Sequence, residues 1–180
     1  MSGSARSVVR TAAVLVAIGA SALGYESPPL AHGFTPVSRA EIVQCSSAID
    51  VVPAASPASS DRVLFDRVWI AGRDRVASPN TQPVGSGRFV YYAKTGFNVL
   101  RGQIGAVVDV PSAWRNRVRI TWGNVASAVS IRFPGCRSGP AWASYAGGFL
   151  FRDKRGGCVP LRIAVQGRAT TVYFSAGRRC

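Results

Sequence analysis

Arginine at alternating positions is the feature of this sequence with the clearest chemical potential. Arg115, Arg117 and Arg119 are each separated by one residue, and Val118 and Ile120, which alternate with them, are apolar. A period of two is typical of a β-strand with one buried face, so the arginines are predicted to form a comb on the exposed face, about 6.6–6.8 Å apart. Guanidinium groups in such a row can bind phosphate or carboxylate groups in bidentate fashion.

Two further arginines, Arg132 and Arg162, also alternate with apolar neighbours. Each is therefore predicted to point to the polar side of its own strand. Whether all five arginines share one sheet stays open, and we treat the five together as candidate anion-binding residues. The alternative is a merely solvated face, because Arg outnumbers Lys 20 to 2, a bias that GC-rich coding also produces.

Positive charge is concentrated in the C-terminal half of the chain. The sequence holds 22 Lys+Arg against 8 Asp+Glu, a formal net charge of +14. Residues 88–180 carry 15 Lys+Arg and two acids, whereas residues 23–87 carry five Arg and six acids. The expected ligands outside the cytoplasm are anionic wall polymers, lipid headgroups, acidic polysaccharides or free nucleic acid. Cytoplasmic nucleic acid is not an expected partner, although Trp114, Tyr91 and Tyr92 are aromatic residues on which bases could stack.

Catalytic chemistry has few residues available. His32 is the one histidine, and it lies in a Pro-rich segment where a general base would lack rigid support. No phosphate-binding loop, metal-ligand spacing or nucleophile elbow occurs, so we predict no catalytic residue, no metal and no cofactor. The enzymatic alternative is a small secreted hydrolase in which Asp66 and Asp109 form a glycosidase-like carboxylate pair, and this requires both carboxylates in one cleft.

The four cysteines are an even set without C-x-x-C spacing, which favours two disulfides over a metal or redox site. Three connectivities are open for Cys45, Cys136, Cys158 and Cys180. A hairpin that turns at Gln166-Gly167 would bring Cys158 and Cys180 to the same end and would leave the other two to pair. The same hairpin register places Cys158 opposite Ser175, five residues short of Cys180.

The N-terminal segment has the pattern of a secretory signal peptide. Arg6 and Arg10 supply its positive region, Thr11–Leu23 its apolar stretch and Ala20-Ser21-Ala22 a small-residue cleavage site. We therefore predict a signal peptide over residues 1–22 and a secreted or extracytoplasmic protein. The alternative is an uncleaved signal that anchors the chain in the membrane, but the apolar stretch is shorter than the roughly 20 residues that a spanning helix needs.

Residues 23–61 are predicted to form a spacer, because they are rich in Pro and small residues and show no sustained period. Within this spacer, Ser38 and Glu41 match a capping box in front of Ile42 and Val43. This match predicts one short helical turn.

From residue 62 to residue 180 the sequence predicts an all-β domain, an antiparallel β-sandwich of Ig-like or related type. Short apolar runs recur between Gly, Pro, Asn and Ser, and several alternate cleanly with polar residues. The predicted strands are Val63–Ile70, Arg88–Lys94, Ala106–Val110, Arg117–Trp122, Val129–Phe133, Ala143–Phe151, Val159–Val165 and Thr170–Ser175.

Several motifs in the last half of the chain form a recognisable set. They are Trp142, Tyr145 and Gly147-Gly148, followed by Cys158, Pro160 and Cys180. With these motifs, residues 89–180 resemble small exported proteins of actinobacteria. The resemblance implies a secreted or envelope location and a β-rich domain, and it assigns no catalytic residue. The Gly pair itself predicts either a bulge with close backbone contact or a flexible site.

Together these patterns favour a secreted, disulfide-bonded β-sandwich that works by binding. The expected partner is an anionic envelope polymer or a partner protein. A partner protein would meet an exposed loop such as Ser78–Gly87.

Overall fold

The residues described by the computed structural model are 39–49, 63–71, 88–102, 105–139 and 141–180. All of them belong to one compact unit. The predicted signal peptide (1–22), His32, the loop Ser78–Gly87 and most of the predicted spacer lie outside the described residues, so the statements made about them above stay predictions.

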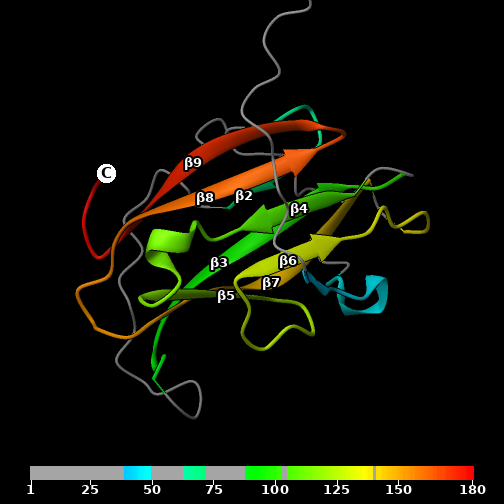
Figure 1. Ribbon diagram of the computed structural model, residues 1–180. Coiled ribbons are helices and arrows are strands. Elements are labelled where there is room, and N and C mark those ends of the chain that lie inside the picture. The colour runs from blue at the N-terminus through cyan, green and yellow to red at the C-terminus, as the bar shows by residue number, and fades with distance from the viewer. Residues whose placement is uncertain (1–38, 50–62, 72–87, 103–104, 140) are drawn as a thin grey trace, which may run out of the picture. The chain divides into compact units, whose positions relative to one another are not determined.

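The described chain is an all-β sandwich, as the alternation of apolar and polar residues predicts (Figure 1). Two sheets pack their apolar faces around one core. Each of the eight predicted strands overlaps an observed one. In chain order the elements are β1 (Glu41–Ile42), the 3-10 turn η1 (Cys45–Ser47), β2 (Val68–Ile70), β3 (Tyr91–Leu100), β4 (Ala106–Asp109), the 3-10 turn η2 (Ser112–Trp114), β5 (Val118–Trp122), β6 (Ser130–Phe133), β7 (Trp142–Phe151), β8 (Gly157–Val165) and β9 (Arg168–Ala176).

The two sheets differ in size and order. One has five strands in the order β1-β6-β4-β8-β9, and the other has four in the order β2-β3-β7-β5. Neighbouring strands are antiparallel, apart from the parallel pair β1–β6. The β8–β9 hairpin turns at Gln166–Gly167 as predicted, and both turn residues have positive φ, as a tight two-residue turn requires.

Aromatic side chains fill the centre of the core. Phe97 of β3 stacks on Phe133 of β6 with 4.2 Å between ring centroids, and Trp122 of β5 lies 5.1 Å from Phe97. Phe149 of β7 contacts Phe174 of β9 at 5.0 Å. The Phe97–Phe133 and Phe149–Phe174 contacts join the two sheets. Such ring pairs contribute about 0.5–1.5 kcal/mol beyond the area that they bury, so they help to fix how the sheets face each other.

Gly147 and Gly148 lie in β7, which pairs with β3 on one side and with β5 on the other. A Cβ on Gly147 would collide with the carbonyl oxygen of Thr121, and a Cβ on Gly148 would collide with that of Ala93. The hydroxyl of Tyr92 also donates to the carbonyl oxygen of Gly147 at 2.5 Å. Of the two interpretations left open by the sequence, the structure shows the close backbone contact.

The helical turn predicted from Ser38 and Glu41 is wrong. Glu41 and Ile42 form β1 and pair with Ile131 and Arg132 of β6. The backbone N–H of Val43 then donates to the carbonyl oxygen of Arg132 at 3.0 Å, and Val43 is fully buried. Pairing with β6 and burial of Val43 outweigh a capping motif that can stabilise a helix only locally.

The cysteines form two disulfides, Cys45–Cys136 and Cys158–Cys180, with Cα–Cα distances of 5.7 and 5.1 Å. This is the pairing that the hairpin favoured. Cys158 indeed lies opposite Ser175, and the chain then bends at Gly177, whose φ is +76°. The bend closes the five-residue gap and lets the N–H of Cys180 donate to the Ser175 hydroxyl at 3.0 Å.

Two disulfides indicate folding in an oxidising, extracytoplasmic environment. Over the described ranges, no helix has both the length and the apolar character needed to span a bilayer.

The sandwich has two ends, which we name for their contents. The hairpin end contains the Gln166–Gly167 turn, the turn before β2 and the loop from β6 to β7, which holds Cys136. The basic end contains η2, the starts of β5 and β8, and the chain that follows β9. Short connections between the sheets, such as residues 152–156 between β7 and β8, keep the ends of both sheets together.

Candidate functional site

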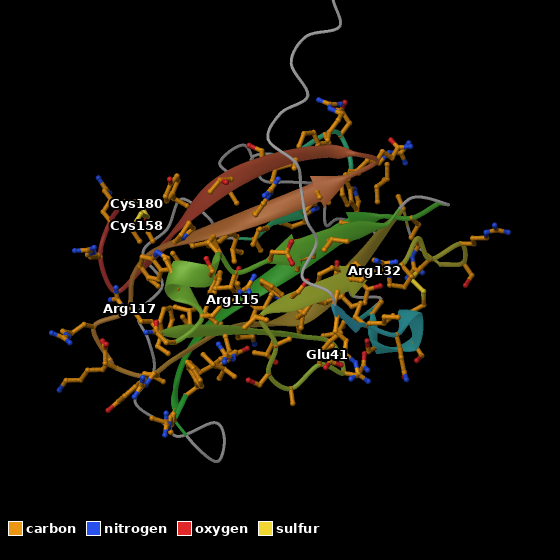
Figure 2. The ribbon with its side chains drawn as sticks, in the orientation of Figure 1. Glu41, Arg115, Arg117, Arg132, Cys158 and Cys180 are labelled. Atoms are coloured by element: carbon orange, nitrogen blue, oxygen red, sulfur yellow. A yellow bond between two sulfur atoms is a disulfide. The ribbon has the colours of Figure 1, made fainter. Side chains whose placement is uncertain are left out.

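The basic end gathers more than half of the described cations. Among the described residues of this end, Asp153 is the one acidic side chain. Figure 2 shows Arg115 and Arg117 on the same side of the molecule as the Cys158–Cys180 disulfide. The cations of the basic end are Arg88, Arg115, Arg117, Arg119, Arg152, Lys154, Arg155, Arg178 and Arg179.

The regular arginine comb predicted from the sequence is wrong in its geometry. β5 begins only at Val118, so Arg119 alone belongs to the strand. Arg115 and Arg117 lie in the turn after η2, where the N–H of Arg117 donates to the carbonyl oxygen of Trp114 at 2.9 Å. The turn over residues 115–117 replaces the start of the expected strand, so the three arginines do not form a regular row.

Arg117 is held by an aromatic ring. Its guanidinium carbon lies 4.7 Å from the ring centroid of Trp114, a cation–π contact. The ring in turn lies against Gly157 at the start of β8, where an added Cβ would approach Trp114 to 3.1 Å. The lack of a side chain at Gly157 therefore leaves the space that the Trp114 ring occupies.

Arg115 and Arg119 are held by carbonyl oxygens of the same turn. The Nε of Arg115 donates to the carbonyl oxygen of Val110 at 2.9 Å, and an Nη of Arg119 donates to that of Arg115. The guanidinium of Arg119 also lies 4.7 Å from the centroid of the Phe89 ring. Burial, and after it the positive charge of Arg115, lower the pKa of Arg119. The two cations thus repel each other at this end.

Arg152 joins the cluster from the end of β7. An Nη of Arg152 donates to the carbonyl oxygen of Asn116 at 3.3 Å. Among the residues that the structure describes, the single ion pair of the basic end joins Arg155 to Asp153 at 3.5 Å. That pair is exposed and contributes little stability. Carbonyl oxygens and rings therefore orient the guanidinium groups of Arg115, Arg117, Arg119 and Arg152, and no described carboxylate neutralises them.

The Cys158–Cys180 disulfide brings two more arginines to this end. Arg178 and Arg179 are exposed and stand just before Cys180, which the disulfide holds beside β8. Gly157 precedes Cys158 and contacts Trp114. The disulfide therefore attaches the residues before Cys180 to the part of β8 on which the Trp114 ring lies. The disulfide therefore adds positive charge to the cluster.

The remaining two candidate arginines lie elsewhere. Arg132 is on β6 and Arg162 is on β8, both in the five-stranded sheet, whereas Arg119 is in the four-stranded sheet. Ile131 and Ile163 are buried in the core, so Arg132 and Arg162 point outward, as predicted. The question left open by the sequence is thus answered: the five arginines do not share one sheet.

The two carboxylates of the hydrolase hypothesis belong to different sheets. Asp66 is exposed in the turn before β2, where Phe65 and Asp66 both have positive φ. It does not point into the core with its neighbours, since the strand begins only at Val68. Asp109 lies on the outer face of the five-stranded sheet, and no hydrogen bond joins the two carboxylates in the described part of the chain. Within that part, no group of three or more metal-ligating side chains occurs.

Sequence reasoning missed the contribution of Arg152, Arg155, Arg178 and Arg179. The signals were present as two short basic runs, residues 152–155 and 178–179. Once Cys158 is paired with Cys180, the second run must lie near the start of β8 and hence near the first.

Fold and site together define a disulfide-bonded β-sandwich with one strongly basic end. No protein-family model, curated protein or solved structure matches the chain.

Proposed function

We propose that this protein is an exported, non-catalytic binding module that attaches to anionic polymers of the cell envelope through its basic end. One observation carries the proposal: the guanidinium groups of Arg115, Arg117, Arg119 and Arg152 are oriented by carbonyl oxygens and aromatic rings and are not paired with any carboxylate that the structure describes. Oriented but unneutralised guanidinium groups are prepared to bind phosphate, sulfate or carboxylate groups.

Electrostatic repulsion supports the same interpretation. Burial, and after it the positive charge of Arg115, lower the pKa of Arg119. A bound anion would relieve this repulsion, so the cluster favours an anion over an empty state. The disulfides support an extracytoplasmic location, and the proposed signal peptide over residues 1–22 and the resemblance to exported actinobacterial proteins agree with it.

The test compares dextran sulfate with uncharged dextran as probes for the purified, oxidised protein. We expect binding to dextran sulfate alone, with an affinity that falls steeply as salt rises, because screening weakens exposed charge pairs. Arg117→Glu reverses the charge beside Trp114 and is expected to weaken binding about tenfold, which corresponds to about 1.4 kcal/mol. Binding that does not depend on salt, or that is equal for both polymers, would reject the proposal.

A further inference from the structure

A second candidate site lies on the outer face of the five-stranded sheet and uses none of the cations of the basic end. On the paired strands β4 and β6, Arg132 stands opposite Val107, and Ser130 stands opposite Asp109. The residues between them, such as Val108, are buried in the core, so these four side chains share the outer face. They form two rows, separated by the roughly 6.8 Å that two residues span in an antiparallel strand.

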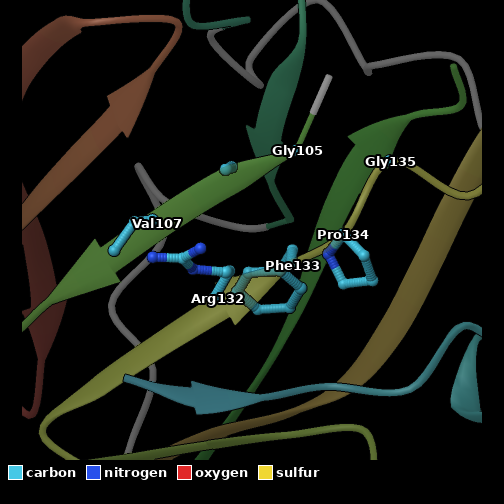
Figure 3. Close-up of a pocket in the computed structure, with 7 residues that line it drawn as sticks. Gly105, Val107, Arg132, Phe133, Pro134 and Gly135 are labelled. Atoms are coloured by element: carbon cyan, nitrogen blue, oxygen red, sulfur yellow. The ribbon is translucent and has the colours of Figure 1, made fainter. Parts of the chain in front are cut away.

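The first row borders a hollow of about 380 Å³. Figure 3 shows the guanidinium of Arg132 reaching toward Val107, with Pro134 and Gly105 at the rim. A Cβ on Gly105 would collide with the carbonyl oxygen of Phe133, so the backbones of β4 and β6 close the floor tightly. Arg132 is exposed and makes no ion pair with any residue that the structure describes. The row therefore offers one uncompensated cation beside an apolar surface.

The second row holds two buried oxygen atoms that lack hydrogen-bond partners. Asp109 is 5% exposed and Ser130 is 1% exposed. Oδ1 of Asp109 and Oγ of Ser130 are without a partner in the described chain. Arg162 stands opposite Asp109 on β8 and has interactions of its own. Since buried polar atoms are paired in more than about 90% of cases, two such atoms on directly opposed residues indicate a missing hydrogen-bonding partner.

We propose that these two rows bind a zwitterionic ligand, an amino-acid-like or short-peptide molecule whose carboxylate and ammonium groups are roughly 6–8 Å apart. The carboxylate pairs with Arg132, an aliphatic stem lies over Val107, and the ammonium donates to Asp109 Oδ1 and Ser130 Oγ. A carboxylate oxygen can only accept hydrogen bonds, so the group bound at Asp109 must be a donor.

The chemistry excludes simpler ligands from filling the site. A plain anion would satisfy Arg132 but leave the Asp109 oxygen unpaired, and a plain cation would satisfy Asp109 but leave Arg132 unpaired. Because the Asp109 and Ser130 oxygens are enclosed, binding includes a side-chain rotation at Asp109 or Arg162, a change that is common on complex formation. This site is independent of the proposed polymer binding, because it uses a different face and none of the residues of the basic end.

The test uses three matched probes on the purified full chain, measured by calorimetric titration. They are 6-aminohexanoate, which carries both charged groups, hexanoate, which lacks the ammonium, and hexylamine, which lacks the carboxylate. We expect 6-aminohexanoate to bind at least about tenfold more tightly than either of the others, the effect of one charge-assisted hydrogen-bonded pair. Equal affinity for 6-aminohexanoate and hexanoate, or no binding of any probe, would overturn the proposal.

Variants assign each charged group to its partner. Arg132→Gln is expected to reduce 6-aminohexanoate binding to the level of hexylamine, and Asp109→Asn to the level of hexanoate. Ser130→Ala, which keeps the size of the buried side chain, should weaken 6-aminohexanoate and leave hexanoate unchanged even if Asp109→Asn fails to fold. Arg117→Glu should leave the preference for 6-aminohexanoate over hexanoate unchanged, because both probes carry the carboxylate that the basic end could bind. Arg132→Gln should leave dextran sulfate binding unchanged. Retention of the full 6-aminohexanoate preference in Arg132→Gln and Ser130→Ala would contradict the assignment.

Discussion

The two ends of the sandwich position arginine in the same way but differ in how many they hold. At the basic end Arg117 lies 4.7 Å from the Trp114 ring, and at the hairpin end Arg168 lies 4.7 Å from the Phe65 ring. The hairpin end has three other described cations, Arg67, Arg101 and Arg137. The basic end adds charge from η2, the β7–β8 connection and the residues before Cys180. A cation–π contact therefore occurs at both ends of the sandwich and does not by itself mark a binding site. The larger number of cations distinguishes the basic end.

The two disulfides also differ, both in their burial and in the segments that they hold. Cys136 at the hairpin end is 3% exposed, and the hydroxyl of Tyr145 donates to its sulfur at 3.2 Å. Its partner Cys45 follows β1, and Ile49 then bridges to Ser144 of β7, so this disulfide fixes a segment that joins the two sheets. Cys180 at the basic end is exposed and tethers only the residues after β9. One disulfide therefore stabilises the fold, and the other mainly positions charge.

Removal of the Cys45–Cys136 disulfide should have the largest effect on stability. The cysteines are 91 residues apart, and for a loop of that length the loss in unfolding free energy is expected to be about 4–5 kcal/mol. We predict that the Cys45→Ser/Cys136→Ser double variant melts roughly 10–20 °C lower by differential scanning calorimetry. A variant as stable as the natural protein would show that the N-terminal segment is not held to the fold by this bond.

Removal of the Cys158–Cys180 disulfide should cost less stability but reduce binding. The separation is 22 residues, and the β8–β9 pairing already holds most of this loop, so we expect a loss of at most about 3 kcal/mol. In the Cys158→Ser/Cys180→Ser variant, Arg178 and Arg179 are no longer tethered, and the affinity for dextran sulfate should fall by about threefold, or about 0.7 kcal/mol. Unchanged binding in a folded variant would separate this disulfide from the site.

The smallest predicted effect concerns the tyrosine beneath the buried disulfide. Burial raises the pKa of Tyr145, and the positive charge of Arg101 opposes this only in part. A raised pKa in the folded state means that stability is fully present below the pKa of the unfolded tyrosine, about 10, and is lost as the pH rises through the folded value. Tyr145→Phe should therefore show a smaller loss of stability between about pH 9 and 11, measured by urea unfolding.

A control is available in Tyr92, whose pKa is also raised by burial. Tyr92→Phe should reduce the same alkaline loss without changing the environment of the Cys45–Cys136 disulfide. If neither variant alters the alkaline loss, ionisation of these tyrosines does not control stability in that range.

Most of the fold could be predicted from the sequence because its strands alternate clearly. Val159, Leu161, Ile163 and Val165 face the core, and Arg162 between them faces outward. The hairpin and the register of Cys158 against Ser175 followed from the same alternation. β1 could not be predicted, because two residues carry no period and their structure depends on pairing with β6, which is remote in sequence.

The candidate site was predictable in its composition but not in its geometry. The sequence identified Arg115, Arg117 and Arg119, yet alternation alone could not show that η2 would replace the first part of the strand with a turn. The second site was less visible still. Ser130 and Asp109 become notable only when the register of β4 and β6 places them opposite each other.

The most direct measurement compares Arg117→Glu with Arg168→Glu for binding of dextran sulfate at one fixed salt concentration. Both variants have the same net charge, and both remove a guanidinium that lies over an aromatic ring at 4.7 Å. If the basic end is the site, Arg117→Glu should weaken binding about tenfold while Arg168→Glu changes it by less than about twofold. Equal losses in the two variants would mean that the overall positive charge, and not the arrangement around Trp114, attracts the polymer.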